Sequence, residues 1–356
     1  MFTPQVSIAL RTYNQENHIA KTVKSVLNQT FQDWELIIVD DNSPDGTIDE
    51  LKKFQDDRIK IYKNEKNLGV IGNLNKVLSY CQGEYISILD GDDIYKKEKL
   101  DRQVNFLNSN QDYGAVFSFI DIKYNPQNKK STDAFHYLNS RINKPCGSRA
   151  AMLKDFFFHD NYLAFPTEMF RRQYLLEFPE NLIALGDCNF HIKMLLQTKI
   201  KVLEEYLVEY DISDIDSHVS SWTCHDANKI EELFVMDNFL LIDDINLFKE
   251  IFFNEYEKYG ELTKENIPYL LIRIALNSQK NFWARYALSR LFSDNKNFTK
   301  IMNTNNLSYN DYIALKNSPY HIIRRKNILG IPISKKVYSS KVTYYIWDFP
   351  VFTRNI

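Results

Sequence analysis

Short apolar runs alternate with amphipathic segments over the first 120 residues. The runs predict β-strands at Val6–Leu10, Leu36–Val39, Ile59–Tyr62, Tyr85–Leu89 and Ala115–Ile120. Between them, apolar residues at helical spacing predict helices at Asn17–Asn28, Ile48–Phe54, Leu74–Cys81 and Lys97–Leu107. Strands that alternate with helices indicate an α/β fold with a parallel, doubly wound sheet.

The rest of the chain has a different pattern. Residues 122–149 are polar and turn-rich, which predicts a loop-rich excursion. Apolar patterns return at Met152–Phe158 and Met169–Phe178, and a helix is predicted at Asp187–Gln197. Two long helical patterns follow, at Asn228–Tyr259 and Pro268–Leu291. We therefore divide the chain into two halves of one α/β domain, 1–120 and 121–222, a helical subdomain at 223–315 and a tail at 316–356.

Composition is typical of a globular protein, with 44% apolar and 25% charged residues. The formal net charge is only -2, so we expect no nucleic-acid partner. The four cysteines are far apart and form no C-x-x-C pair, which predicts reduced thiols in a cytoplasmic protein. The first residues lack the basic and apolar regions of a signal peptide, and no apolar window reaches the roughly 18 residues of a membrane-spanning helix.

Charge is nevertheless uneven along the chain. The tail at 316–356 holds eight basic residues and one acidic residue, together with many aromatic residues. A basic, aromatic segment is a candidate for peripheral contact with the inner face of the cell membrane. The alternative is a tail that folds against the core or against a dimer partner.

Polar side chains cluster where three of the predicted strands end, at Arg11–Asn14, Asp40–Ser43 and Asp90–Asp93. Open α/β sheets bind ligands at the carboxyl ends of their strands, so we expect one shared cleft. The carboxylates of the last cluster repel one another unless a divalent cation with phosphate co-ligands is bound. The cluster therefore predicts a metal–diphosphate site, with a solvated acidic turn as the alternative.

Several ordered motifs resemble the inverting family-2 glycosyltransferases with the GT-A fold. "VSIALRTYN" is similar to the first strand and nucleotide loop of that family, and "SVLNQTFQDWELIIVDDNSPDGT" to its most recognisable stretch. "NLGVIGNLN" and "GEYISILDGDD" lead into its D-x-D motif, and "MFRRQYLLEFPENLIALGDCNFHIKML" resembles its acceptor half. The resemblance covers residues 6–221 and implies a Rossmann-like nucleotide-diphosphosugar fold, to which the helical patterns add a mostly helical C-terminal extension.

The resemblance implies roles for the residues of the acidic cluster. Asp92 would ligate Mn²⁺ or Mg²⁺, which bridges the donor diphosphate, and Asp90 would contact the ribose, with Gly91 between them. Asp93 is expected to cap the helix that follows, because an acidic residue is favourable at a helix N-terminus. Tyr13 would lie over the uracil ring and Asp41 would accept the uracil N3–H. Ordinary packing and turn capping are the alternatives for these last two residues.

Further donor contacts follow from the same resemblance. Arg11 and Thr12 would contact the nucleotide, and Arg11 either neutralises phosphate charge or is a surface cation. Three residues match the family's approach to the D-x-D strand: Asn67, Gly69 and Asn75. Leu74 replaces a frequent arginine of the family. We expect the contact of that arginine to be absent or to be supplied by Arg11.

Asp187 is the candidate catalytic base, because it follows Gly186 at the family's "E-D" or "G-D" position. A base that takes the proton of the acceptor hydroxyl contributes about 10²–10⁴-fold to the rate. A structural helix cap is the alternative. His218 would reach the metal or the diphosphate, or is a structural histidine. The segment Leu163–Phe170 and Glu180 are expected to face the acceptor.

These residues together predict a metal-dependent, inverting, hexosyltransferase-like glycosyltransferase. It would move a sugar from a nucleotide donor of the UDP class to a glycan or lipid-linked acceptor. The resemblance implies a role in bacterial surface polysaccharide synthesis, such as capsule or lipopolysaccharide. One alternative is a non-catalytic nucleotide-sugar-binding or assembly module, which loss of Asp92 or Asp187 would have indicated. Another is a nucleotidyltransferase, but Arg11–Asn14 is not the glycine- and lysine-rich phosphate loop that such an enzyme needs.

Overall fold

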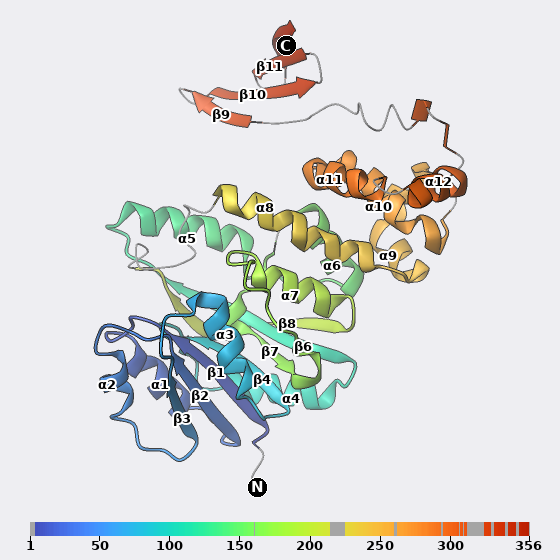
Figure 1. Ribbon diagram of the computed structural model, residues 1–356. Helices are drawn as coiled ribbons and strands as arrows, with labels where there is room; N and C mark the ends of the chain where they lie inside the picture. The colour runs from blue at the N-terminus through green and yellow to red at the C-terminus, as the bar shows by residue number, and fades with distance from the viewer. Residues whose placement is uncertain are drawn as a thin grey trace. The chain divides into compact units, whose positions relative to one another are not determined.

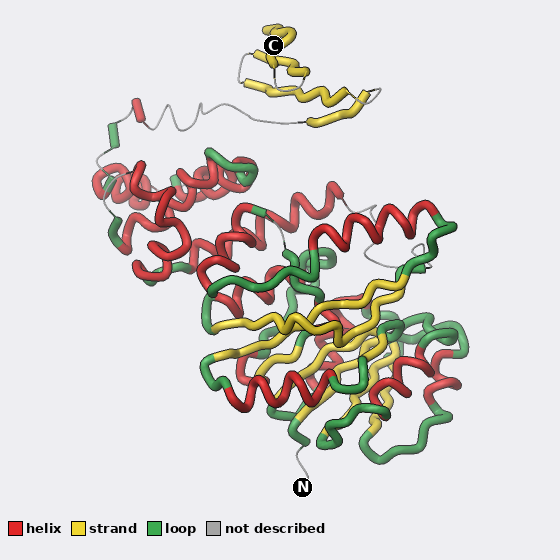
Figure 2. The backbone as a smooth tube through the Cα atoms, turned by 180° about the vertical axis from the view of Figure 1, so that it is seen from behind, coloured by secondary structure: helices red, strands yellow, loops and turns green. Residues whose placement is uncertain are grey.

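The structure is a computed structural model that divides into two compact units, residues 1–238 and 239–356. The first unit carries a large sheet with flanking helices, and the second carries helices and a small sheet (Figure 1 and Figure 2). The described residues are 4–159, 161–213, 225–259, 262–292, 295–305, 307–308, 310–311, 324–328, 331–338, 341–346 and 349–355.

Within the described residues, the first unit contains one eight-stranded sheet of order β3-β2-β1-β4-β7-β6-β8-β5. Its first four strands are parallel neighbours: β1 (Val6–Thr12), β2 (Trp34–Asp40), β3 (Ile59–Lys63) and β4 (Tyr85–Asp90). The others are β5 (Ile94–Tyr95), β6 (Tyr113–Lys123), β7 (Met169–Arg171) and β8 (Lys199–Asp211).

The sheet is mixed: β1 to β4 are parallel neighbours and β6 pairs parallel with β8, so the prediction of a parallel sheet is wrong only for β5 and β7. β7 pairs antiparallel with both β4 and β6, and β5 pairs antiparallel with β8. The alternation of strand and helix patterns predicts which elements form. It does not predict the direction in which a strand of two or three residues enters the sheet.

Helices cover both faces of the sheet (Figure 1). Val6, Ile8 and Leu10 of β1 share a buried cluster with side chains of α1 and α4, while α3 packs on β1 and β2. The predicted helices are confirmed in this half, although α3 begins five residues earlier than predicted. Apart from α5, which is described next, the helices that precede β8 are α1 (Ile19–Leu27), α2 (Thr47–Leu51), α3 (Gly69–Ser79), α4 (Lys99–Ser109), α6 (Arg149–Phe158) and α7 (Gly186–Leu195).

The predicted loop over residues 122–149 is wrong, because it contains helix α5 (Lys129–Arg141). The Asn128 side chain caps this helix by accepting from the backbone N–H of Lys130 and of Ser131. Only Ser131 and Ala134 of the helix are buried. Ala134, Phe135 and Leu138 pack in a small apolar cluster, so the helix has only a short apolar stripe among polar residues, and a short stripe is a weak signal for a helix.

Helix α8 (His225–Met236) ends the first unit, and the second unit is mostly helical, as predicted. Its helix α10 is buried at eight of ten positions and packs against α9 and α11. None of the described helices is both long and apolar enough to cross a lipid bilayer. The helices of this unit are α9 (Ile245–Tyr256), α10 (Ile267–Leu276), α11 (Asn281–Leu291) and α12 (Asn295–Thr304).

The C-terminal tail folds into antiparallel strands that the sequence analysis did not predict. Their order within the described residues is β12-β11-β10-β9. The predicted membrane contact of residues 316–356 depends on side chains that lie outside the described part of the structure. The strands are β9 (Arg324–Ile328), β10 (Ile331–Tyr338), β11 (Lys341–Ile346) and β12 (Phe349–Asn355).

Candidate active site

The carboxyl ends of β1, β2 and β4 meet at one edge of the sheet. The register places Arg11 beside Asp90 across β1 and β4, and Thr12 beside Asp40 across β1 and β2. Because these strands are parallel and in contact, the polar clusters that follow them share one edge, as expected for a ligand site in an open α/β sheet.

Arg11 binds Asp90 through both carboxylate oxygens. Its Nη2 donates to Oδ2 at 3.0 Å and its Nε donates to Oδ1. The guanidinium carbon also lies 5.6 Å from the centre of the Phe165 ring. Burial opposes the charged guanidinium, but the carboxylates of Asp90, Asp92 and Asp187 outweigh burial and raise the pKa of Arg11. Arg11 therefore links the acidic edge electrostatically to the candidate base.

Gly91 allows the ends of β1 and β4 to approach closely. A Cβ atom at this position would lie 2.7 Å from Thr12 Oγ1, which is closer than real Cβ contacts. The Gly91 carbonyl accepts from Thr22 Oγ1 at 2.9 Å. Thr12 itself is only 3% exposed, so its predicted nucleotide contact stays a prediction. Asp92 follows Gly91 and lies half-buried, 3.4 Å from Gln15 Nε2.

Asp93 does not cap a helix, so that prediction is wrong. Strand β5 follows it directly, and α4 begins later, with Glu98 at its N-cap position. Asp93 is 1% exposed and its Oδ2 has no hydrogen-bond partner among the described residues. Burial, Asp92 and Asp90 together raise the pKa of Asp93 well above its usual range.

Asp41 organises the loop before α3. Its carboxylate accepts from Asn64 Nδ2 at 2.8 Å and from the backbone N–H of Leu68 and Gly69 at 2.8 and 2.9 Å. Gly69 has a φ of 78°, which a residue without a Cβ adopts at little cost. Tyr13 is 47% exposed at the same edge. Its exposure argues against the packing alternative, although base stacking stays a prediction.

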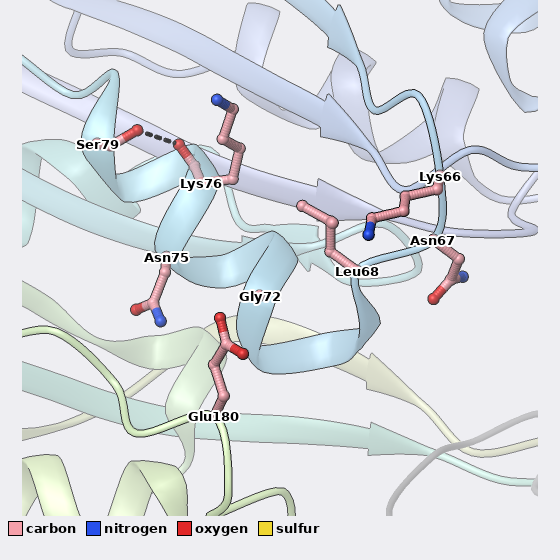
Figure 3. A pocket seen from close by; sticks show the side chains of 8 residues that line it. All are labelled: Lys66, Asn67, Leu68, Gly72, Asn75, Lys76, Ser79 and Glu180. Atoms are coloured by element: carbon pink, nitrogen blue, oxygen red, sulfur yellow. Dashed lines mark hydrogen bonds between the residues drawn. The ribbon is translucent and has the colours of Figure 1, made fainter.

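Asn67 and Asn75 line a pocket of about 470 Å³ beside α3 (Figure 3). Asn67 is exposed, and its Oδ1 accepts from the Gly69 N–H at 2.9 Å. The amide of Asn75 is bonded at both ends to the backbone of Phe178, at 2.8 and 2.9 Å. Glu180 approaches the pocket from the segment that follows Phe178. The lining contains none of the candidate catalytic carboxylates, so the pocket lies beside the predicted chemistry.

Asp187 is the second residue of α7 and is half-buried. Leu185 holds the N-cap position, so the alternative role of Asp187 as N-cap is disfavoured. Asn161 Nδ2 donates to Asp187 Oδ2 at 3.0 Å, and the Cys188 N–H donates to Oδ1 at 2.6 Å. The sequence analysis missed Asn161, because it lies far from Asp187 in the chain and belongs to no motif.

A buried hydrogen-bonded pair, Glu168 and His191, lies one helical turn beyond Asp187. His191 Nε2 and Glu168 Oε2 are 3.2 Å apart, and both side chains are fully buried. Burial raises the pKa of Glu168 and Asp187 adds to that effect, although His191 acts in the opposite direction. The segment Leu163–Phe170 is therefore mostly core, and the expectation that all of it faces an acceptor is too broad. Only Ala164 and Phe165 in it are partly exposed.

The donor set fits a divalent cation that arrives with phosphate ligands. Among the described residues, no three His, Cys, Asp or Glu side chains gather closely enough to form a complete metal cage. Asp90 and Asp92 offer hard oxygen ligands at one edge, with the unpartnered Asp93 Oδ2 beneath. Mg²⁺ and similar ions typically use one or two carboxylates with phosphates and water. The predicted ligand His218 lies outside the described residues.

Known proteins resemble this chain at the levels of family, sequence and fold. A family model described as Glycosyl transferase family 2 matches residues 7–175. An uncharacterized glycosyltransferase of Methanocaldococcus jannaschii, MJ1057, is 32% identical over 227 residues, which are 62% of this chain and 75% of that protein.

One further relative has a name that states a donor, and one solved structure of similar fold contains a bound UDP-sugar. The Escherichia coli protein WfgD, named as a UDP-Glc:α-D-GlcNAc-diphosphoundecaprenol β-1,3-glucosyltransferase, is 41% identical over 105 residues. That match covers 30% of this chain and 42% of the relative, so the chain spans less than half of its length. The crystal structure of S. aureus TarS 1-349 in complex with UDP-GlcNAc matches with a TM-score of 0.58 and 16% identity, over 96% of this chain and 99% of that one. This last likeness shows a shared fold.

Proposed function

Because the chain belongs to glycosyl transferase family 2, we propose that it transfers a sugar from a UDP-class donor to a glycan or lipid-linked acceptor, with inversion at the anomeric carbon. The observation that carries this proposal is that Asp90, Asp92 and Arg11 lie at one edge of the sheet. The charge of Asp187 also acts on Arg11. The name of the E. coli relative supports a UDP donor and a diphosphate-lipid acceptor, and the UDP-GlcNAc bound to TarS supports a UDP donor.

The donor half must bind a nucleotide and stabilise a diphosphate leaving group. A bound Mn²⁺ or Mg²⁺, held by Asp92, would supply Lewis-acid stabilisation of that leaving group. Asp41 is suited to bind the uracil base. A carboxylate offers about four acceptor positions, and the described hydrogen bonds of Asp41 use three of them. Tyr13, exposed beside it, offers a ring for stacking on uracil.

The acceptor half must remove a proton. Asp187 accepts the proton of the acceptor hydroxyl while the oxygen attacks the anomeric carbon from the face opposite the diphosphate. Asn161 Nδ2 and the Cys188 N–H each donate to one Asp187 oxygen, which fixes the orientation of the carboxylate. Direct displacement breaks the bond to the diphosphate as the new glycosidic bond forms. The anomeric centre is therefore inverted.

The decisive experiment is a calorimetric titration of the full chain with UDP, with and without Mn²⁺, and with GDP and dTDP as controls. We expect tight UDP binding only with the metal, followed by turnover of a UDP-sugar in a transfer assay. NMR of the product then gives the anomeric configuration. Failure of every nucleotide to bind would overturn the donor assignment. Metal-dependent UDP binding without turnover of any UDP-sugar would favour the non-catalytic module.

A further inference from the structure

Glu231 of helix α8 holds the backbone segment that leads to Asp187. Its carboxylate accepts three backbone N–H groups: those of Ile183 at 3.1 Å, Ala184 at 2.9 Å and Leu185 at 2.8 Å. Glu231 is only 7% exposed, and all four residues belong to the first unit. A buried carboxylate that binds consecutive backbone N–H groups forms charge-assisted hydrogen bonds, which are about twice as strong as neutral ones.

The bonds of Glu231 lie directly before the N-terminus of α7. Within the described residues, α7 begins at Gly186 without a side-chain cap bond from Leu185, its N-cap residue. Glu231 satisfies the N–H of Leu185 and of the two residues before it, and so fixes the path by which the chain enters the helix.

A second bond ties the same two helical regions together. Asn238 Nδ2 donates to Asn189 Oδ1 at 2.8 Å and to the Val235 carbonyl at 2.8 Å. Asn238 is 6% exposed and Asn189 is 5% exposed, so this bond is also buried. Asp187 lies between Leu185 and Asn189 in the chain. The first turn of α7 is therefore held on both sides of Asp187 by side chains from residues 231–238.

We propose that Glu231 is a positioning residue for the candidate base Asp187, an inference that rests on the proposed function. Glu231 moves no proton and touches no substrate. It keeps the start of α7 in place, so that Asp187 meets the acceptor hydroxyl at the acidic edge of the sheet. A misplacement of about 1 Å in a catalytic group costs about 10²-fold in rate. Loss of Glu231 should therefore lower turnover and leave donor binding intact.

The test compares Glu231→Ala and Glu231→Gln with the control Glu177→Ala. Glu177 is an exposed carboxylate in the segment that leads to the same loop. We expect kcat to fall 10- to 100-fold in Glu231→Ala, with UDP affinity unchanged within twofold. Glu231→Gln should retain part of the activity, because its amide oxygen still accepts backbone N–H groups. Glu177→Ala should match the wild type. A parallel loss of UDP affinity and kcat would overturn the proposal.

A double-mutant cycle with Asp187→Asn separates this proposal from the proposed function. If Glu231 acts through Asp187, adding Glu231→Ala or Glu231→Gln to Asp187→Asn should lower the residual kcat by less than twofold. An equal loss in both backgrounds would show that Glu231 does not act through Asp187. Full activity of Asp187→Asn alone would instead remove the base assignment itself. Glu231→Gln keeps the cycle usable if Glu231→Ala fails to fold.

Discussion

The donor edge and the acceptor half of this protein are assembled in different ways. The donor edge is built from residues at or directly after the ends of β1, β2 and β4, such as Arg11, Asp41 and Asp90. The acceptor half brings together Asn161, Asp187 and Glu231, which come from three separate segments. Each donor residue lies in a recognisable motif, whereas Asn161 and Glu231 belong to none.

The difference follows from how the two regions are held together. Parallel strands in register place their ends side by side, so the order of residues along the chain is enough to predict the donor edge. The acceptor half depends on the packing of helices and loops, and on buried polar bonds such as those of Glu231. No short-range pattern in the sequence encodes such contacts.

The two regions also differ in how they treat charge. At the donor edge, Arg11 and Asp90 form an ion pair and both side chains remain partly accessible, while Asp93 is the one carboxylate of the Asp90–Asp93 cluster that is buried. Beneath Asp187, by contrast, Glu168 and His191 are fully buried and leave Glu168 Oε1 and His191 Nδ1 without partners among the described residues. An unpartnered buried polar atom is costly. Substitutions in the two regions should therefore fail in different ways.

The largest expected effect is the contrast in UDP binding and kcat between the variants Asp92→Asn and Asp187→Asn. Asp92→Asn should lose metal-dependent UDP binding while the protein stays folded. Asp187→Asn should bind UDP as the wild type does and lose about 10²–10⁴-fold in kcat, the usual contribution of a general base. Calorimetry and a transfer assay on both variants measure the contrast. Weakened UDP binding in Asp187→Asn would move this residue to the donor edge and break the comparison.

A smaller effect is expected for Gly91→Ala, which tests how tightly β1 and β4 approach. The new Cβ would lie 2.7 Å from Thr12 Oγ1 and 3.2 Å from Gln15 Cγ. Overpacking of this kind typically costs about 1–3 kcal/mol in the free energy of unfolding. Denaturant unfolding gives this value, and UDP titration reports the accompanying loss of affinity. Adding Thr12→Ala to Gly91→Ala removes the atom nearest to the new Cβ. The double variant should regain part of the stability and part of the UDP affinity. A Gly91→Ala variant as stable as the wild type would show that the edge is more adaptable than its geometry indicates.

The smallest effect concerns the pH dependence of stability in the acceptor half. The pKa of Glu168 is raised by burial, so the folded state binds this proton more tightly than the unfolded state does. The stability that Glu168 contributes is thus fully present below its pKa in the unfolded chain. It is lost as the pH rises through its pKa in the folded protein. Glu168→Gln removes this dependence and keeps an acceptor for His191. We expect the Tm of Glu168→Gln minus the Tm of the wild type to be about 2 °C larger at pH 8 than at pH 4.

Thermal unfolding of both proteins between pH 4 and pH 8 checks this expectation. Glu177→Gln is the matched control, because it makes the same substitution at an exposed carboxylate. Tm curves for Glu168→Gln and wild type that run parallel across the range would contradict the prediction. They would show that Glu168 has the same proton affinity in the folded and unfolded chains.

Local periodicity and motif order were sufficient for the donor half. They predicted β1 to β4, the helices between them and the shared edge at Asp90–Asp93, because each depends on residues close in sequence or on strands in register. Local periodicity did not predict α5, which has only a short apolar stripe, or the strands of the tail. It also assigned Asp93 to a helix cap that β5 precludes.

The acceptor half shows what depends on long-range packing. The sequence identified Asp187 through its neighbours in a motif, but the bonds that hold it come from Asn161 and, through the loop before α7, from Glu231. These partners meet only after α7 and α8 have packed in the first unit. Contacts between residues far apart in the chain follow from the three-dimensional arrangement of helices. A single sequence carries no local pattern that specifies them.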